Sequence, residues 1–247
     1  MEVKTEPAGR LYDIFHEAKL KPEAHSSRKV WAEVFDVPEE DTGTILKMLA
    51  ELIQLTHATK EKLEKLNDIN HELYLRPFSQ IERVLSHINL DAGWKHWKDQ
   101  IDEPTIYGLQ FCSDKLNRVT NYTKIPNEEI DSIKQSLSEL TDQILNSELD
   151  NSLKELLVRN LEGLRQAIIS FKIKGIEGIQ REVELNLGSI ILHREEIRSK
   201  SISGKESALL SKYFKFIEGL NKTISTAKNI KELGGKDFLK LIGIDNG

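Results

Sequence analysis

The sequence contains little cysteine and no long apolar run. Cysteine occurs once in 247 residues, at position 112, which excludes an intrachain disulfide framework and any zinc module built on cysteine thiolates. No stretch approaches the roughly 18 consecutive apolar residues that a membrane-spanning helix needs. Residues 1–10 also lack the apolar centre of a secretory signal. We therefore expect a cytoplasmic protein without a membrane partner.

Positive charge is likewise scarce. Lys and Arg number 35 against 40 Asp and Glu, so the formal net charge is −5. Proteins that bind nucleic acid in bulk carry a basic surplus, and the mild acidity therefore argues against a nucleic-acid partner. Charged residues make up 30% of the chain and apolar residues 38%, a balance that is typical of thin, solvated helical layers.

Proline is absent from the second half of the chain. All 6 prolines lie at or before position 126, and proline interrupts helices because it lacks the amide N–H that a helix uses. We expect shorter helices in an N-terminal helical subdomain, residues 1–124, and long helices in a C-terminal helical subdomain, residues 125–247. The alternative of a single domain stays open, because helical bundles often continue through loops such as Asn121–Asn127.

Apolar residues recur at helical spacing along the chain. Between positions 45 and 66 they step alternately by four and three residues, which is a heptad-like pattern. Two further stripes, in residues 128–146 and 153–174, flank the helix-breaking Asp150–Ser152 and predict an antiparallel hairpin. Period-two alternation flanked by turns does not occur. The sequence therefore predicts an all-α fold, a multi-helix bundle with long antiparallel helical hairpins.

Particular residues are expected at two helix ends. Asp41 or Thr42 is suited to cap the helix that contains residues 45–66, because a short side-chain oxygen accepts hydrogen bonds from the free N–H groups of a first turn. Gly175 follows the stripe over residues 153–174. We expect it just past the end of that helix, because glycine enters the left-handed conformation without a Cβ clash.

The arrangements that carry common enzyme chemistry are missing. His71 and Glu72 begin a zinc-type H-E-x-x-H motif, but position 75 is Leu75, and no histidine has a glutamate three residues before it. Neither a phosphate-binding loop nor a dinucleotide-binding glycine motif occurs. Cys112 lies in a predicted helix and is expected to be a buried apolar side chain rather than a nucleophile. We expect no metal site and no cofactor.

One catalytic alternative rests on Arg10 and His16. Their spacing, R-x5-H, matches that of HEPN-type helical ribonucleases, in which the two side chains converge on one phosphodiester and promote attack by the 2′-OH. A chain with this many Arg and His residues produces about one such match by chance. The alternative is a metal-independent helical ribonuclease or toxin that uses Arg10 and His16.

The segment Leu90–Leu116 is rich in aromatic residues. Trp94 and Trp97 are three residues apart and therefore share a helix face. We take these two with His96 and Tyr107 as candidate binding residues. Three roles stay open for them: core packing, a protein interface, and a small-ligand pocket bounded by Trp94, Trp97 and Tyr107. Stacking on nucleic-acid bases is opposed by the acidic residues that flank the segment.

The segment Phe171–Ile191 (FKIKGIEGIQREVELNLGSII), which follows a leucine-rich hairpin, resembles uncharacterised helical regions of bacterial phage-defence and toxin-type proteins. The resemblance extends from Leu149 to about Arg198 and is carried by apolar periodicity and glycines. It implies an accessory component of a bacterial defence or conflict system. It assigns no catalytic residue.

These observations predict a non-enzymatic adaptor or regulatory protein. Its partner is expected to be another protein or a second copy of itself, in a hetero-complex or a homo-oligomer. This prediction rests on three observations: the sequence lacks the residue arrangements of common enzymes, it contains long amphipathic helical stripes, and it contains the pair of tryptophans. The alternatives are the ribonuclease that uses Arg10 and His16 and a small-ligand sensor with a pocket near Trp94, Trp97 and Tyr107.

Overall fold

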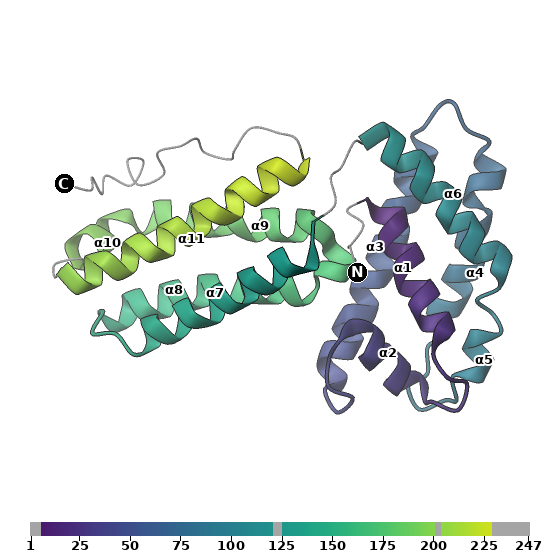
Figure 1. Ribbon diagram of the computed structural model, residues 1–247, viewed down its shortest axis with the longest axis horizontal. Helices are drawn as coiled ribbons and strands as arrows, with labels where there is room; N and C mark the ends of the chain where they lie inside the picture. Colours follow the sequence, from purple (N-terminus) through teal and green to yellow (C-terminus); the bar gives the residue numbers. More distant parts are fainter. Residues whose placement is uncertain (1–5, 121–124, 201–203, 229–247) are drawn as a thin grey trace. The chain divides into compact units, whose positions relative to one another are not determined.

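The computed structural model describes residues 6–120, 125–200 and 204–228. Within these ranges it contains eleven α-helices and no β-strand (Figure 1). The all-α fold predicted from the apolar periodicity is therefore confirmed. None of the helices in these ranges is long and apolar enough to cross a membrane.

The described residues divide into two compact units. The N-terminal unit contains the described residues up to 120 and the segment Lys172–Gly175, and the C-terminal unit contains the others. The predicted boundary after residue 124 adjoins the segment 121–124, which lies outside the described residues. The assignment of Lys172–Gly175 to the N-terminal unit is a feature that a linear division of the chain does not anticipate.

Six helices begin in the N-terminal unit: α1 (Pro7–Leu20), α2 (Ser27–Phe35), α3 (Thr42–Glu64), α4 (His71–Ser86), α5 (Lys95–Lys98) and α6 (Glu103–Thr120). The remaining helices are α7 (Asn127–Leu145), α8 (Asn151–Ile169), α9 (Phe171–Leu192), α10 (Arg194–Lys200) and α11 (Gly204–Lys228). The first turn of α9 includes the segment that belongs to the N-terminal unit.

Short polar side chains fix the start of several helices. Asp41 Oδ1 accepts a hydrogen bond of 3.0 Å from the Thr44 N–H at the start of α3, so Asp41 is the N-cap and that prediction is confirmed. Ser26 caps α2 and Asn70 caps α4 in the same way. Each cap satisfies an N–H group that a first helical turn leaves without a partner.

Aromatic rings form the centre of the N-terminal unit. Trp31 packs against three other rings at centroid distances of 5.4 to 6.3 Å: Phe35, Trp94 and Phe15. All four side chains are buried. Around them, α1 and α4 each pack against both α3 and α6. The position of α6 is therefore set by two helices at once.

The segment Lys172–Gly175 completes the N-terminal unit. The side chain of Ile173 is 1% exposed and belongs to the core of this unit. Lys172 Nζ donates to the Val34 carbonyl at 3.0 Å, in the last turn of α2, where carbonyl groups lack a helical partner. A short piece of chain thus supplies both an apolar side chain and a helix-capping ammonium group.

The backbone at Gly175 has φ 61° and ψ −158°. The positive φ is the one predicted, but ψ lies outside the left-handed helical region. The predicted helix over 153–174 is divided near Ser170, because α8 ends at Ile169 and α9 begins at Phe171. α9 extends to Leu192, but its backbone is not helical at Gly175, so the predicted break at this residue is present as a kink. Glycine is required because almost no other residue adopts this combination of angles.

The C-terminal unit is built from long helices. α7 and α8 pack against each other and are joined by residues 146–150, so they form the predicted hairpin (Figure 1). α11 packs against α7, and α10 packs against α8. Leucine and isoleucine side chains at helical spacing are buried along the hairpin: Leu137, Leu140, Ile144, Leu157, Leu161, Leu164 and Ile168.

A polar network lies in the interior of the C-terminal unit. The Tyr213 hydroxyl donates to Asn186 Oδ1 at 2.8 Å and accepts from Asn160 Nδ2 at 3.3 Å. Asn186 Nδ2 donates to the Asn160 carbonyl at 3.1 Å. Burial raises the pKa of Tyr213 well above its ordinary value, so the hydroxyl keeps its proton. Rotation of α8, α9 or α11 about its own axis would break these hydrogen bonds and leave polar groups unpaired in the interior, which is costly. The network therefore fixes which side of each of the three helices faces the interior.

We expect Gly175→Ala to lower the free energy of unfolding by about 1–3 kcal/mol, because a Cβ is strained at these backbone angles. The control is Gly219→Ala in α11. An added Cβ at Gly219 meets no atom within 4 Å, so we expect a gain of about 0.5–1 kcal/mol. Urea unfolding followed by circular dichroism measures both. Equal effects of the two substitutions would contradict the special role of Gly175.

Tyr213→Phe is expected to cost about 1–3 kcal/mol of stability, because it leaves Asn186 and Asn160 with unpaired polar atoms in the interior. Tyr107→Phe removes the same hydroxyl from an exposed ring and should leave the stability unchanged within about 0.5 kcal/mol. Thermal unfolding of both variants decides the matter. A Tyr213→Phe variant as stable as the parent would show that the network contributes nothing.

Candidate functional site

The two tryptophans proposed as binding residues lie in the interior of the N-terminal unit. Trp94 is 0% exposed, and its indole N–H donates to the Ala18 carbonyl at 3.1 Å. Trp97 is 6% exposed. Among the three roles left open for this pair, the geometry supports core packing. Trp94 is therefore corrected from a binding residue to a core residue.

His96 and Tyr107 are exposed and belong to different helices. The His96 ring lies 4.9 Å from the Trp97 ring, centroid to centroid, at the surface of α5. Tyr107 lies on α6 and is 55% exposed. Because Trp94 faces the interior and Tyr107 faces solvent, the residues proposed for a small-ligand pocket do not line one shared cavity.

Arg10 and His16 lie on different sides of α1. They are six residues apart, which separates their directions by about 120° around a helix axis. Arg10 is 4% exposed, and its charge acts on the buried carboxylate of Glu6. The half-buried His16 ring stacks on Tyr12 at 5.3 Å. The two side chains do not converge on one point, as a joint grip on a phosphate requires.

A buried polar cluster attaches the start of α1 to α6. Glu6 accepts hydrogen bonds from the Ala8 N–H at 2.8 Å and from the Ser113 hydroxyl. Burial raises the pKa of Glu6, against the effect of these hydrogen bonds. Burial, with the nearby Glu6 charge, also raises the pKa of Cys112 to about 12. The Cys112 thiol therefore stays protonated at neutral pH, so it lacks the thiolate that a nucleophile needs.

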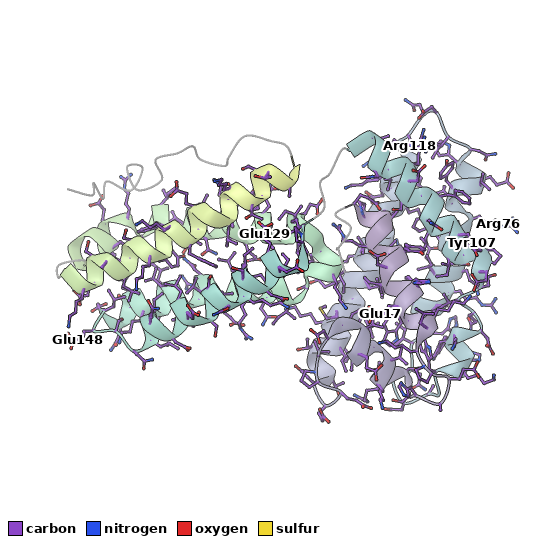
Figure 2. The ribbon with its side chains drawn as sticks, in the orientation of Figure 1. Glu17, Arg76, Tyr107, Arg118, Glu129 and Glu148 are labelled. Atoms are coloured by element: carbon purple, nitrogen blue, oxygen red, sulfur yellow. The ribbon has the colours of Figure 1, made fainter. Side chains whose placement is uncertain are left out.

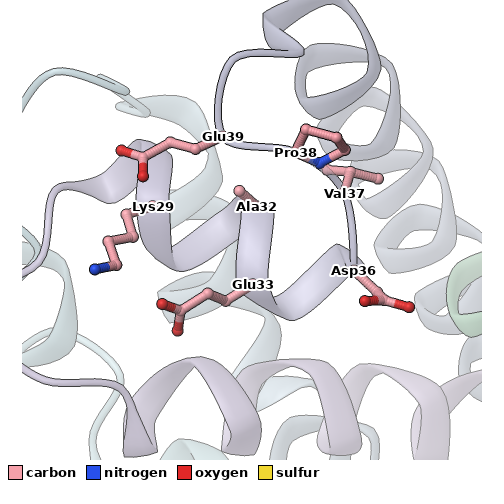
Figure 3. A pocket seen from close by; sticks show the side chains of 7 residues that line it. All are labelled: Lys29, Ala32, Glu33, Asp36, Val37, Pro38 and Glu39. Atoms are coloured by element: carbon pink, nitrogen blue, oxygen red, sulfur yellow. The ribbon is translucent and has the colours of Figure 1, made fainter.

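A shallow pocket of about 460 Å³ lies beside the end of α2 (Figure 3). Its lining consists of acidic residues, one lysine and small apolar residues: Lys29, Ala32, Glu33, Asp36, Val37, Pro38 and Glu39. The Glu33 carboxylate is already paired with Lys21 at 3.4 Å. In the described part of the chain, no group of three His, Cys, Asp or Glu side chains could hold a metal ion.

Helices α4 and α6 approach closely at one point. A Cβ added to Gly108 of α6 would lie 2.9 Å from Cγ of Pro77 in α4, which is too close for any side chain. One turn further along α6, the Cys112 thiol donates to the Tyr74 carbonyl at 3.2 Å. Glycine at position 108 is what allows this approach, and the two contacts fix the register of the two helices.

Large apolar side chains are exposed beside this close approach. Leu73 on α4 is 62% exposed, and Tyr107 and Phe111 on α6 are 55% and 68% exposed. Tyr107 and Phe111 are four residues apart and share a side of α6. Arg76 directly precedes Pro77, and Tyr107 directly precedes Gly108, which is the residue that Pro77 contacts; Figure 2 labels both side chains. We call Leu73, Arg76, Tyr107 and Phe111 the α4–α6 face.

The α4–α6 face combines exposed apolar and aromatic side chains with an exposed arginine. Tyrosine and arginine are enriched among the residues that contribute most to binding between proteins. The Arg76 guanidinium makes no ion pair with any residue that the structure describes. Of the four residues of this face, Tyr107 was expected from the sequence as a binding residue, and Leu73, Arg76 and Phe111 were not. The four-residue spacing of Tyr107 and Phe111 was visible, whereas the exposure of that side of the helix was not.

We expect Cys112 to react with a thiol reagent at least about 100-fold more slowly in the native protein than in urea, because it is buried and protonated. Absorbance after addition of dithionitrobenzoate at pH 8 measures the rate. A Gly219→Cys variant provides the control, since its additional thiol lies in open space and should react at once. Rapid labelling of Cys112 in the native protein would contradict its burial.

Comparison with known proteins provides no functional assignment. No protein-family model, no curated protein and no solved structure matches this chain significantly.

Proposed function

We propose that this chain is a non-enzymatic adaptor or regulatory protein that binds another protein through the α4–α6 face. The observation that supports the proposal is the exposure of Leu73, Tyr107 and Phe111 beside the contact between α4 and α6. Exposed leucines occur singly on most proteins, but a group of large apolar side chains that includes two aromatic rings marks an interaction surface.

The face is well suited to gain binding energy. Full burial of one such apolar side chain is worth about 1.5–3 kcal/mol. Tyr107 and Phe111 have few rotatable bonds, and the contact of Gly108 with Pro77 holds their helix in place. The cost of ordering this surface on binding is therefore small.

Charge indicates the chemistry of the partner. Arg76 and Arg83 are seven residues apart and lie on the same side of α4. Neither guanidinium is ion-paired within the described residues, and the exposed Glu72 is not within ion-pairing distance of Arg76. A partner segment with apolar side chains flanked by carboxylates is complementary to this surface. The defence or conflict system implied by the resemblance of Phe171–Ile191 is a setting in which such an adaptor would act.

The test compares tagged variants purified under mild conditions from the native cell. A partner present in stoichiometric amount with the parent chain should be reduced at least about tenfold by Phe111→Glu. Leu20→Glu is the matched control, because Leu20 is equally exposed, at 69%, and lies at the end of α1. This variant should keep the partner. Circular dichroism verifies that both variants are folded.

Two outcomes would overturn the proposal. One is a partner that Phe111→Glu and the parent chain retain equally. The other is an absorbance ratio at 260 and 280 nm that shows RNA or DNA surviving moderate salt in place of a protein. Capture of a protein by the parent chain alone does not support the proposal, because only the comparison with Phe111→Glu locates the binding surface.

A further inference from the structure

The outer side of α9 in the C-terminal unit carries a second group of exposed apolar residues. Leu185 is 56% exposed, Ile191 45% and Leu192 83%. On a helix these three positions lie within about 60° of Gly188 around the axis. A Cβ added to Gly188 meets no atom within 4 Å, so this residue also faces open space. We call Leu185, Gly188, Ile191 and Leu192 the α9 stripe.

The interior of the C-terminal unit does not use the α9 stripe. The opposite side of α9 is buried through Val183, Asn186 and Ile190. Asn186 also belongs to the polar network with Tyr213, which fixes the rotation of α9 about its axis. The α9 stripe therefore points outward, because the opposite side of the helix is held in the interior. Packing within the C-terminal unit does not explain why the residues of the stripe are apolar.

The arrangement of residues around Gly188 is self-complementary. In an antiparallel pair of helices that cross at Gly188, a residue n positions before it faces the residue n positions after it in the other copy. Leu185 then faces Ile191, and Leu192 packs on the methylene groups of Glu184. A two-fold axis makes each of these contacts twice. Glycine at the crossing point lets the two backbones approach.

Charge favours the antiparallel arrangement. Seven positions before Gly188 lies Arg181, which is exposed and has no ion pair within the described residues. Seven positions after it lies Glu195, which is exposed at the start of α10 and pairs with Arg194 of its own chain at 3.3 Å. Hydrogen bonds from the His193 N–H to the Ser189 carbonyl at 3.2 Å and from the Ile197 N–H to the His193 carbonyl at 3.0 Å continue the helical pattern past Leu192. An antiparallel pair therefore brings opposite charges together at both ends. A parallel pair would instead place each charge opposite its own copy, which is unfavourable.

We propose that the α9 stripe is the contact surface between two copies of this chain, paired antiparallel about a two-fold axis at Gly188. One helix from each copy forms a smaller interface than the roughly 800 Å² per partner of a stable complex. The dimer is therefore weak, with a dissociation constant on the order of micromolar. The proposal uses different residues and a different unit from the α4–α6 face, so each can fail without the other.

Sedimentation equilibrium of the full chain at about 1 to 100 μM tests for association in this range. We expect the apparent mass to rise with concentration from 28.3 kDa toward twice that value. Leu192→Glu should weaken association at least about tenfold, and it should not disturb folding because Leu192 is 83% exposed. Leu20→Glu is again the matched control. A parent chain that stays monomeric, or a dimer that Leu192→Glu leaves intact, overturns the proposal.

Single cysteines test the orientation of the two helices. Gly188→Cys should form a disulfide-linked dimer under mild oxidation, because the two-fold axis brings both copies of this position together. Arg181→Cys should not, since antiparallel pairing places its two copies about 21 Å apart along the helices. The native Cys112 is buried and does not compete.

Each cross-linking result decides one point. A Gly188→Cys dimer with an uncross-linked Arg181→Cys supports the antiparallel pair. A cross-link at Arg181→Cys shows parallel pairing and overturns the arrangement proposed here. If the Gly188→Cys chain stays reduced, a second copy of the chain does not cover the α9 stripe, and the proposal is overturned. The stripe would then be left for a different protein or for residues 229–247 of the same chain.

Discussion

The contact between Gly108 and Pro77 is the constraint on which the α4–α6 face depends. No side chain fits between these residues, since an added Cβ would lie 2.9 Å from the proline ring. The contact brings α4 and α6 together, and the thiol of Cys112 extends it by one turn. Tyr107 and Phe111 are then held outward on a helix whose inner side is packed against α1 and α4. A preformed surface of this kind loses little conformational entropy when a partner binds.

Buried polar groups in both units form hydrogen bonds between separate segments of the chain. Burial raises the pKa of Cys112 and of Tyr213, so both keep their protons at neutral pH. Glu6 accepts hydrogen bonds that attach the start of α1 to α6. Arg10 acts on the same carboxylate instead of reaching solvent together with His16.

The two proposed surfaces have a joint consequence. A dimer formed through the α9 stripe carries two copies of the α4–α6 face. If a partner presents two binding sites, its second site binds at a raised effective concentration, and modest affinity at each face becomes strong attachment. The arrangement is typical of adaptors, which gain affinity from the number of contacts rather than from one deep pocket.

The sequence by itself determined the all-α fold, the cap at Asp41 and the positive φ of Gly175, because each follows from residues a few positions apart. Tertiary structure decided which aromatic residues are buried. Trp94 is fixed by a carbonyl 76 positions away, whereas Tyr107 has no such contact and faces solvent. The inclusion of Lys172–Gly175 in the N-terminal unit depends likewise on distant residues. Helical periodicity is a local property, but burial depends on contacts between residues far apart in the chain, which periodicity does not specify.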